Sequence, residues 1–135
     1  SRITANTDFE DKANKIMLAF SKDVGSSPSG YTQMMVALGF GIGPSYEIVI
    51  VGDPEAEDTK DMLNSLGKHF IPYKVVLLKP AGQETPDITR IAEYTEYHSS
   101  FDGKATAYVC LDFACKMPVT NTEEMLKLLN VPPGK

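Results

Sequence analysis

The run Tyr46-Glu-Ile-Val-Ile-Val51 constrains the fold of this chain most strongly. It is a continuous stretch rich in β-branched residues, and Pro44 precedes it closely while Gly52 follows it. Such runs are typical of strands that are buried on both faces of a parallel sheet. We therefore expect an α/β domain in which this segment is the first and central strand.

Helices and strands alternate after this run. Tyr73–Leu78 and Ala105–Cys110 are predicted to be the second and third strands. Asp53 and Pro54 suit the N-cap and first position of a helix between the first two strands. A weaker helix is expected over 87–97, and the capping box Thr120-Asn-Thr-Glu123 predicts a last helix. The buried residues expected on the first and last of these helices are Thr59, Met62, Leu63, Leu66, Met125, Leu126 and Leu129.

This alternation predicts a three-stranded parallel sheet of order 2-1-3, because crossovers between parallel strands are right-handed. The second crossover then passes to the opposite face of the sheet from the first. In such sheets ligands bind beyond the carboxyl ends of the strands where the order reverses. We therefore expect Gly52, Asp53, Cys110 and Cys115 to meet there in a crevice.

A helical hairpin is predicted to precede the sheet. Thr7 to Glu10 fits a capping box, and an apolar stripe follows it, consisting of Phe9, Ala13, Ile16, Met17 and Phe20. After the break at 25–30, Tyr31, Met34, Met35 and Leu38 form a second stripe, which Gly39 to Pro44 ends. We expect one domain, 1–135, made of a hairpin (1–43) and an α/β part (44–135). Three strands cannot bury both stripes, so we expect an interface with other parts of a longer polypeptide, or self-association of the isolated chain.

Composition narrows the classes of function. The chain has 135 residues and a formal net charge of -5, and its lysines are dispersed, which argues against a nucleic-acid-binding face. No apolar run approaches the roughly 20 residues of a membrane span, and no signal peptide opens the chain. With only two cysteines, these features favour the cytoplasm. The start at Ser1 and the ending Pro132-Pro-Gly-Lys135 suggest a fragment of a larger protein.

The two cysteines allow three interpretations. A zinc site needs about four ligands, and one pair with x₄ spacing supplies too few. A redox couple is a second option, although the spacing is longer than the C-x-x-C of thioredoxin-like proteins. Two structural thiols are favoured: Cys110 ends an apolar strand, where burial raises the pKa of a thiol. We therefore expect the pair to be reduced and free of metal.

The remaining motifs indicate no catalytic residues. Gly39-Phe-Gly-Ile-Gly43 precedes a strand and lacks the dinucleotide-binding spacing, so it is interpreted as a loop. The acidic residues from Asp53 to Asp58 disfavour a bound pyrophosphate, and we expect no nicotinamide or flavin cofactor. His69 near a helix end and His98 are assigned surface or packing roles, His69 because an imidazole there commonly meets unpaired carbonyls.

Two segments carry a resemblance to a known family. Pro-Ser-Tyr-Glu-Ile-Val-Ile-Val-Gly52 and Ala-Tyr-Val-Cys110-x₄-Cys115-x₂-Pro-Val-Thr120, with the helix that follows, resemble the C-terminal region of the spermatogenesis-associated protein 20 family. These are thioredoxin-domain-containing proteins related to N-acylglucosamine 2-epimerases. The matching features span most of Phe9 to Leu129.

The resemblance implies a longer parent with an N-terminal thioredoxin-like domain and a central α/α toroid. The family's redox centre and any sugar pocket would lie in those parts, so no catalytic residue is carried over onto this chain. We interpret the chain as a non-catalytic accessory domain that supports the toroid. Two alternatives stay open: thiol redox chemistry at Cys110 and Cys115, and small-ligand binding in the crevice between the first and third strands.

Overall fold

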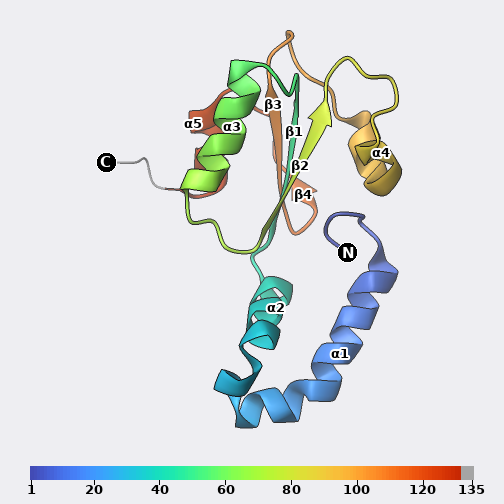
Figure 1. Cartoon of the computed structure of the whole chain (residues 1–135), viewed down its shortest axis with the longest axis vertical. Coiled ribbons are helices and arrows are strands. Elements are labelled where there is room, and N and C mark those ends of the chain that lie inside the picture. The colour runs from blue at the N-terminus through green and yellow to red at the C-terminus, as the bar shows by residue number, and fades with distance from the viewer. Residues whose placement is uncertain (132–135) are drawn as a thin grey trace.

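The computed structural model describes residues 1–131, and Pro132 to Lys135 lie outside the described residues. The chain opens with a helical hairpin formed by α1 (Thr7–Ser26), the 3₁₀ helix η1 (Pro28–Tyr31) and α2 (Thr32–Ile42) (Figure 1). The α/β part follows, in the order β1 (Tyr46–Gly52), α3 (Glu57–Lys68), β2 (Lys74–Pro80), α4 (Ile88–Ile91), the 3₁₀ helix η2 (Glu93–Tyr97), β3 (Thr106–Leu111), β4 (Ala114–Cys115) and α5 (Thr122–Leu128). The predicted mixed α/β fold, with a small sheet and flanking helices, is confirmed.

The sheet has the order β2-β1-β3-β4. The central place of β1 and its parallel pairing with β2 agree with the prediction. The prediction of a wholly parallel sheet is wrong, however, because β3 runs antiparallel to β1. A fourth strand, β4, also pairs with β3 at the edge.

Two tight turns explain this difference. Phe101 and Lys104 form a bridge around Asp102 and Gly103, whose φ angles are 51° and 68°. An Asp-Gly pair with two positive φ angles makes a tight hairpin turn, and here it reverses the chain just before β3. Asp112 and Phe113 also have positive φ, 48° and 65°, and they turn the chain from β3 into β4.

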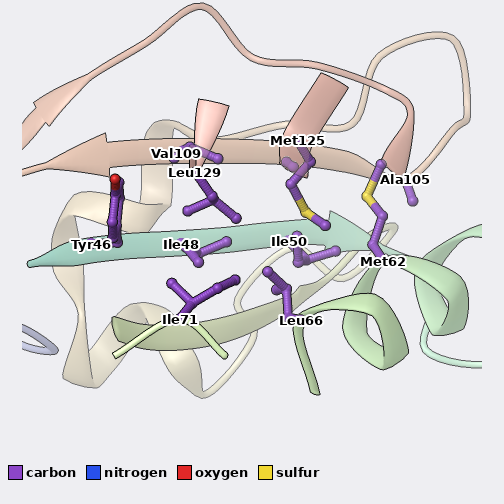
Figure 2. Packing of buried hydrophobic residues seen from close by; sticks show 11 residues of the cluster. Tyr46, Ile48, Ile50, Met62, Leu66, Ile71, Ala105, Val109, Met125 and Leu129 are labelled. Atoms are coloured by element: carbon purple, nitrogen blue, oxygen red, sulfur yellow. The ribbon is translucent and has the colours of Figure 1, made fainter. Parts of the chain in front are cut away.

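The core lies on both faces of β1, every residue of which is buried. One face packs against α3 and α5, which contribute Met62, Leu66 and Met125, and against Leu129 just after α5 (Figure 2). The other face carries a smaller cluster of Val49, Val51, Leu77 and Ala92, with Ile88 and Tyr94 packed against it. The continuous apolar pattern of β1 thus reflects burial between two layers.

Several expected helix starts lie elsewhere. Asn6, not Thr7, caps α1, and its side chain accepts a hydrogen bond from the Asp8 amide at 2.9 Å. Asp53 is not the cap of α3, because α3 begins at Glu57. Instead, Oδ1 of Asp53 accepts a hydrogen bond from the Glu55 amide in a separate turn. Asn121, not Thr120, caps α5. The cap is the adjacent residue in α1 and α5, whereas in α3 it is Ala56, which makes no side-chain cap hydrogen bond.

Two other expected elements differ in length. The helix expected over 87–97 is divided into α4 and η2 at Ala92, whose φ of -121° and ψ of 74° are not helical. Conversely, the glycine segment assigned to a loop is mostly helical, since α2 continues to Ile42. Gly43, with φ of 79°, ends α2 in a backbone conformation that favours glycine.

Candidate functional site

Cys110 and Cys115 face each other across the β3–β4 hairpin and form a disulfide, with their Cα atoms 3.8 Å apart. The amide of Lys116 donates to the Val109 carbonyl at 2.9 Å, so the adjacent Cys110–Cys115 pair occupies a non-hydrogen-bonded position of the ladder. Side chains approach most closely at such positions. The prediction of two reduced thiols is therefore wrong, because it left out the turn that brings the sulfurs together.

Glu47 lies directly opposite Cys110 on the neighbouring strand β1, and only 2% of its surface is exposed. Its two carboxylate oxygens have separate partners. Oε1 accepts from the Arg2 guanidinium at 2.8 Å, and Oε2 accepts from the Phe113 amide at 2.9 Å. A buried carboxylate needs partners of this kind to remain charged.

Arg2 ties the N-terminal segment to the same place. Its guanidinium also lies 3.4 Å from Oδ1 of Asp112 and 4.5 Å from the centre of the Phe113 ring. The side chain of Arg2 is mostly buried, with 12% exposed. The start of the chain, β1 and the β3–β4 turn therefore converge around the carboxylate of Glu47.

A cavity of about 310 Å³ opens beside the disulfide, and its lining is mostly apolar. Tyr94 of η2 and His98, just after η2, form one wall of this cavity. The His98 ring packs on Tyr108, with the ring centres 4.1 Å apart. Among the described residues, the Tyr94 hydroxyl and His98 Nδ1 are buried and have no hydrogen-bond partner. The cavity is lined by Ala5, Glu47, Tyr94, His98, Cys110, Phe113 and Cys115.

Burial sets the charge states of the two aromatic polar groups. The pKa of Tyr94 is raised, first by burial and then by the nearby charge of Glu47, so the phenol keeps its proton. The pKa of His98 is lowered, first by burial and then by the charge of Lys79, which favours the neutral imidazole. Lys79 Nζ is held close by, donating to the carbonyls of Thr95, Glu96 and His98 at 2.7 to 2.9 Å. The site thus combines a disulfide, a paired carboxylate and two neutral polar groups.

The structure does not bring the four predicted crevice residues together. Cys110 pairs with Glu47 near the start of β1, whereas Gly52 ends the same strand, five residues or about 16 Å further along. Because β3 is antiparallel, its carboxyl end meets the amino end of β1. At the Gly52 end, Thr59 and Ala105 pack tightly against the glycine. Of the four predicted crevice residues, only Cys110 and Cys115 line the pocket that the structure shows.

Of the two histidines, His69 has the expected role, because its Nδ1 lies 2.8 Å from the Ser65 carbonyl near the end of α3. His98, assigned to surface or packing, packs on aromatic rings but also lines the pocket. Over residues 1–131, no group of three or more His, Cys, Asp or Glu side chains could hold a metal ion. Within the same range, no helix is long and apolar enough to span a bilayer.

Sequence reasoning missed Glu47 and Tyr94 as pocket residues. One signal was available for Glu47: a charged residue inside a strand that is buried on both faces requires a partner. No comparable signal marks Tyr94, because its place depends on the break between α4 and η2.

These features define a small α/β domain that carries a cross-strand disulfide beside an apolar pocket. The chain is 32% identical over 128 residues to spermatogenesis-associated protein 20 of Rattus norvegicus, covering 95% of this chain and 16% of that protein. It is also 32% identical over 127 residues to the Homo sapiens protein, again covering 16% of it. The chain is thus similar over nearly its whole length to a part of spermatogenesis-associated protein 20, the family that its motifs predict. No family model matches the chain, and no solved structure matches it significantly.

Proposed function

We propose that this chain is a non-catalytic accessory domain of a longer cytoplasmic polypeptide, and that its helical hairpin docks onto the rest of that polypeptide. One observation carries the proposal. Val24 is the only buried residue of the 20-residue helix α1, and no residue of α2 is buried. Helices in globular proteins gain most of their stability by packing an apolar face against other elements. Contact with another part of the longer polypeptide would bury the apolar face that this hairpin leaves exposed.

Several exposed apolar residues of the hairpin lie on one side of α1. Phe9, Ile16 and Phe20 recur along one side of α1 and are 49%, 52% and 46% exposed. On α2, Val36 and Ile42 are 57% and 76% exposed. Figure 1 shows α1 and α2 projecting away from the sheet rather than lying on it. Exposed apolar surface of this extent marks an interaction site more often than a free surface.

The proposed occupant is the remainder of the same polypeptide. The chain spans only about a sixth of the curated relatives, 16% of their length, so most of each relative lies outside the matched segment. The family resemblance suggests that this remainder contains a thioredoxin-like domain and an α/α toroid. A helical hairpin is the element that adds most simply to the helices of a toroid. We therefore place the docking face against the toroid.

A pair of variants in α1 tests the docking proposal. Ile16→Lys places a charge in the exposed apolar stripe, whereas Asn14→Lys places the same charge on the other side of the helix. In the isolated chain both changes should alter the free energy of unfolding by less than about 0.5 kcal/mol, since both positions are exposed. In the full-length protein, only Ile16→Lys should speed cleavage of residues 7–42 by thermolysin.

Three outcomes would reject this docking. Equal cleavage of both full-length variants and the unsubstituted protein would show that the stripe is not covered there. Dimerisation of the isolated chain that persists in the full-length protein, and is lost only in Ile16→Lys, would assign the stripe to a second copy instead. Binding of the full-length protein to lipid vesicles with the same dependence would assign it to a membrane surface.

A further inference from the structure

We propose that the pocket beside Cys110 and Cys115 binds a low-molecular-mass cysteinyl thiol, such as glutathione or cysteine, and that the disulfide exchanges with it through Cys115. None of the residues that line the pocket belongs to α1 or α2. The inference therefore stands independently of the docking proposal.

The two sulfurs differ in access. Cys110 is 2% exposed and lies opposite Glu47 on the neighbouring strand, whereas Cys115 is on the exposed edge strand β4. Thiol–disulfide exchange requires an incoming thiolate to reach one sulfur, and exposed disulfides are the labile ones. Cys115 Sγ is therefore the atom attacked, and Cys110 Sγ is the leaving group.

The hairpin allows both redox states within one fold. Cys110 and Cys115 are paired by the strand register and by the backbone bond from Lys116 to Val109, and neither depends on the sulfur–sulfur bond. The turn at Asp112 and Phe113 is also closed by contacts from Ser45 and Glu47. Reduction thus leaves the two sulfurs side by side, ready to form the bond again.

The pocket supplies recognition. Its volume of about 310 Å³ falls at the lower end of small-ligand sites, which favours a small thiol over a protein domain. The unpartnered Tyr94 hydroxyl and His98 Nδ1 provide hydrogen-bonding positions that an amide or amino-acid group can satisfy. Both groups are neutral near pH 7 because burial raises the pKa of Tyr94 and lowers that of His98. Buried polar groups without partners are costly, so a ligand that pairs with them gains selectivity.

The exchange proceeds in two balanced steps. The ligand thiol loses its proton and its sulfur attacks Cys115 Sγ; the bond to Cys110 breaks, and Cys110 leaves with the electron pair and takes up a proton. A second ligand thiol then attacks the ligand sulfur of the mixed disulfide, releasing the oxidised ligand and the Cys115 thiol. Two thiols are oxidised to one disulfide, and one protein disulfide is reduced to two thiols.

Tryptic digestion after the reaction allows the redox state of the two cysteines to be measured. Cleavage after Lys104 and Lys116 yields the peptide 105–116, which contains both cysteines of this chain. The native protein is incubated with glutathione, cysteine or 2-mercaptoethanol, quenched with an alkylating reagent and digested, and this peptide is quantified by mass spectrometry. The oxidised peptide itself, treated with the same thiols, is the control that has the disulfide but not the pocket.

The preference for a cysteinyl thiol is the decisive quantity. The rate ratio of glutathione, or of cysteine, to 2-mercaptoethanol should be roughly tenfold higher in the native protein than in the peptide, as expected for about one net hydrogen bond. Enhancement with only one of the two identifies the ligand. Tyr94→Phe should reduce this ratio roughly three- to tenfold, because the ratio cancels any change that affects every thiol alike. The Cys110→Ser variant should accumulate a mixed disulfide on Cys115 when given oxidised glutathione.

Three results would overturn the proposal. A disulfide that resists all three thiols in the folded protein would be structural. Equal rate ratios in the protein and the peptide would show that the pocket recognises nothing. A Tyr94→Phe variant that slows every thiol equally would show a general change of structure instead of lost recognition.

Discussion

Glu47 and Cys110 lie directly opposite each other on β1 and β3, and both are 2% exposed. Neighbours in this register share one face of the sheet, so a buried carboxylate lies beside the buried sulfur of a disulfide. Arg2 and the Phe113 amide satisfy that carboxylate. This arrangement links the N-terminal segment, the central strand and the β3–β4 turn.

The Arg2–Glu47 ion pair should contribute strongly to stability. Arg2→Met leaves a buried carboxylate with only one protein donor, and we expect the free energy of unfolding to fall by about 3 kcal/mol. Arg90→Met is the matched control: Arg90 and Asp87 are 81% and 96% exposed and 3.8 Å apart, so its loss should change stability by less than about 1 kcal/mol. Urea denaturation of both variants measures the difference. Equal losses of stability in the two variants would show that the buried carboxylate of Glu47 does not need Arg2 as a partner.

His98 should make the chain less stable as the pH falls. Burial, and then Lys79, lower the pKa of His98 in the folded state, while the unfolded chain has a pKa of about 6.5. Below that pH the unfolded state binds more protons than the folded state, so stability decreases until the pH passes the folded pKa. The other groups that face this imidazole are Tyr94 and Tyr108.

Urea denaturation between pH 8 and pH 5 tests this pH dependence, with His98→Asn as the comparison. The unsubstituted chain should lose more stability than His98→Asn over this range, because carboxylates contribute equally to both. Parallel curves for the two proteins would mean that His98 titrates alike in the folded and unfolded states.

Two glycines should respond in opposite directions to substitution by alanine. A Cβ at Gly52 would collide with Thr59 Oγ1 and lie 3.3 Å from the Cα of Ala105, so Gly52→Ala should destabilise the fold by about 2 kcal/mol. Gly67, near the end of α3, has open space around it, and Gly67→Ala should stabilise by about 0.5 to 1 kcal/mol. Thermal unfolding of the two variants compares them. A neutral Gly52→Ala would show that β1 and α3 can move apart.

The parts of the fold that follow from hydrophobic pattern could be predicted. The run from Tyr46 to Val51 marks the central strand because both of its faces are buried. The direction of β3 could not be read from that pattern, since a strand has the same residues in either direction. It depends on the Asp102-Gly103 turn, a recognisable signal that outweighs the alternation of helices and strands.

The candidate site was predicted only in part. The two cysteines stand out by type, but their pairing depends on the Asp112–Phe113 turn, and Phe113 is an unusual residue at positive φ. Glu47 lies on β1, whereas Tyr94 and His98 lie in and just after η2, and only the tertiary fold brings these two segments to the cysteines. Spacing along a chain carries little information about such a constellation.

Docking of the helical hairpin is tested most directly by amide hydrogen exchange. The exchange of residues 7–42 is measured in the isolated chain and in the full-length protein, with β1 as an internal reference that is buried in both. Docking predicts exchange in α1 and α2 that is at least about tenfold slower in the full-length protein, while β1 exchanges alike in both. Equal, rapid exchange of α1 and α2 in the two proteins would contradict the assignment of this chain as a docked accessory domain.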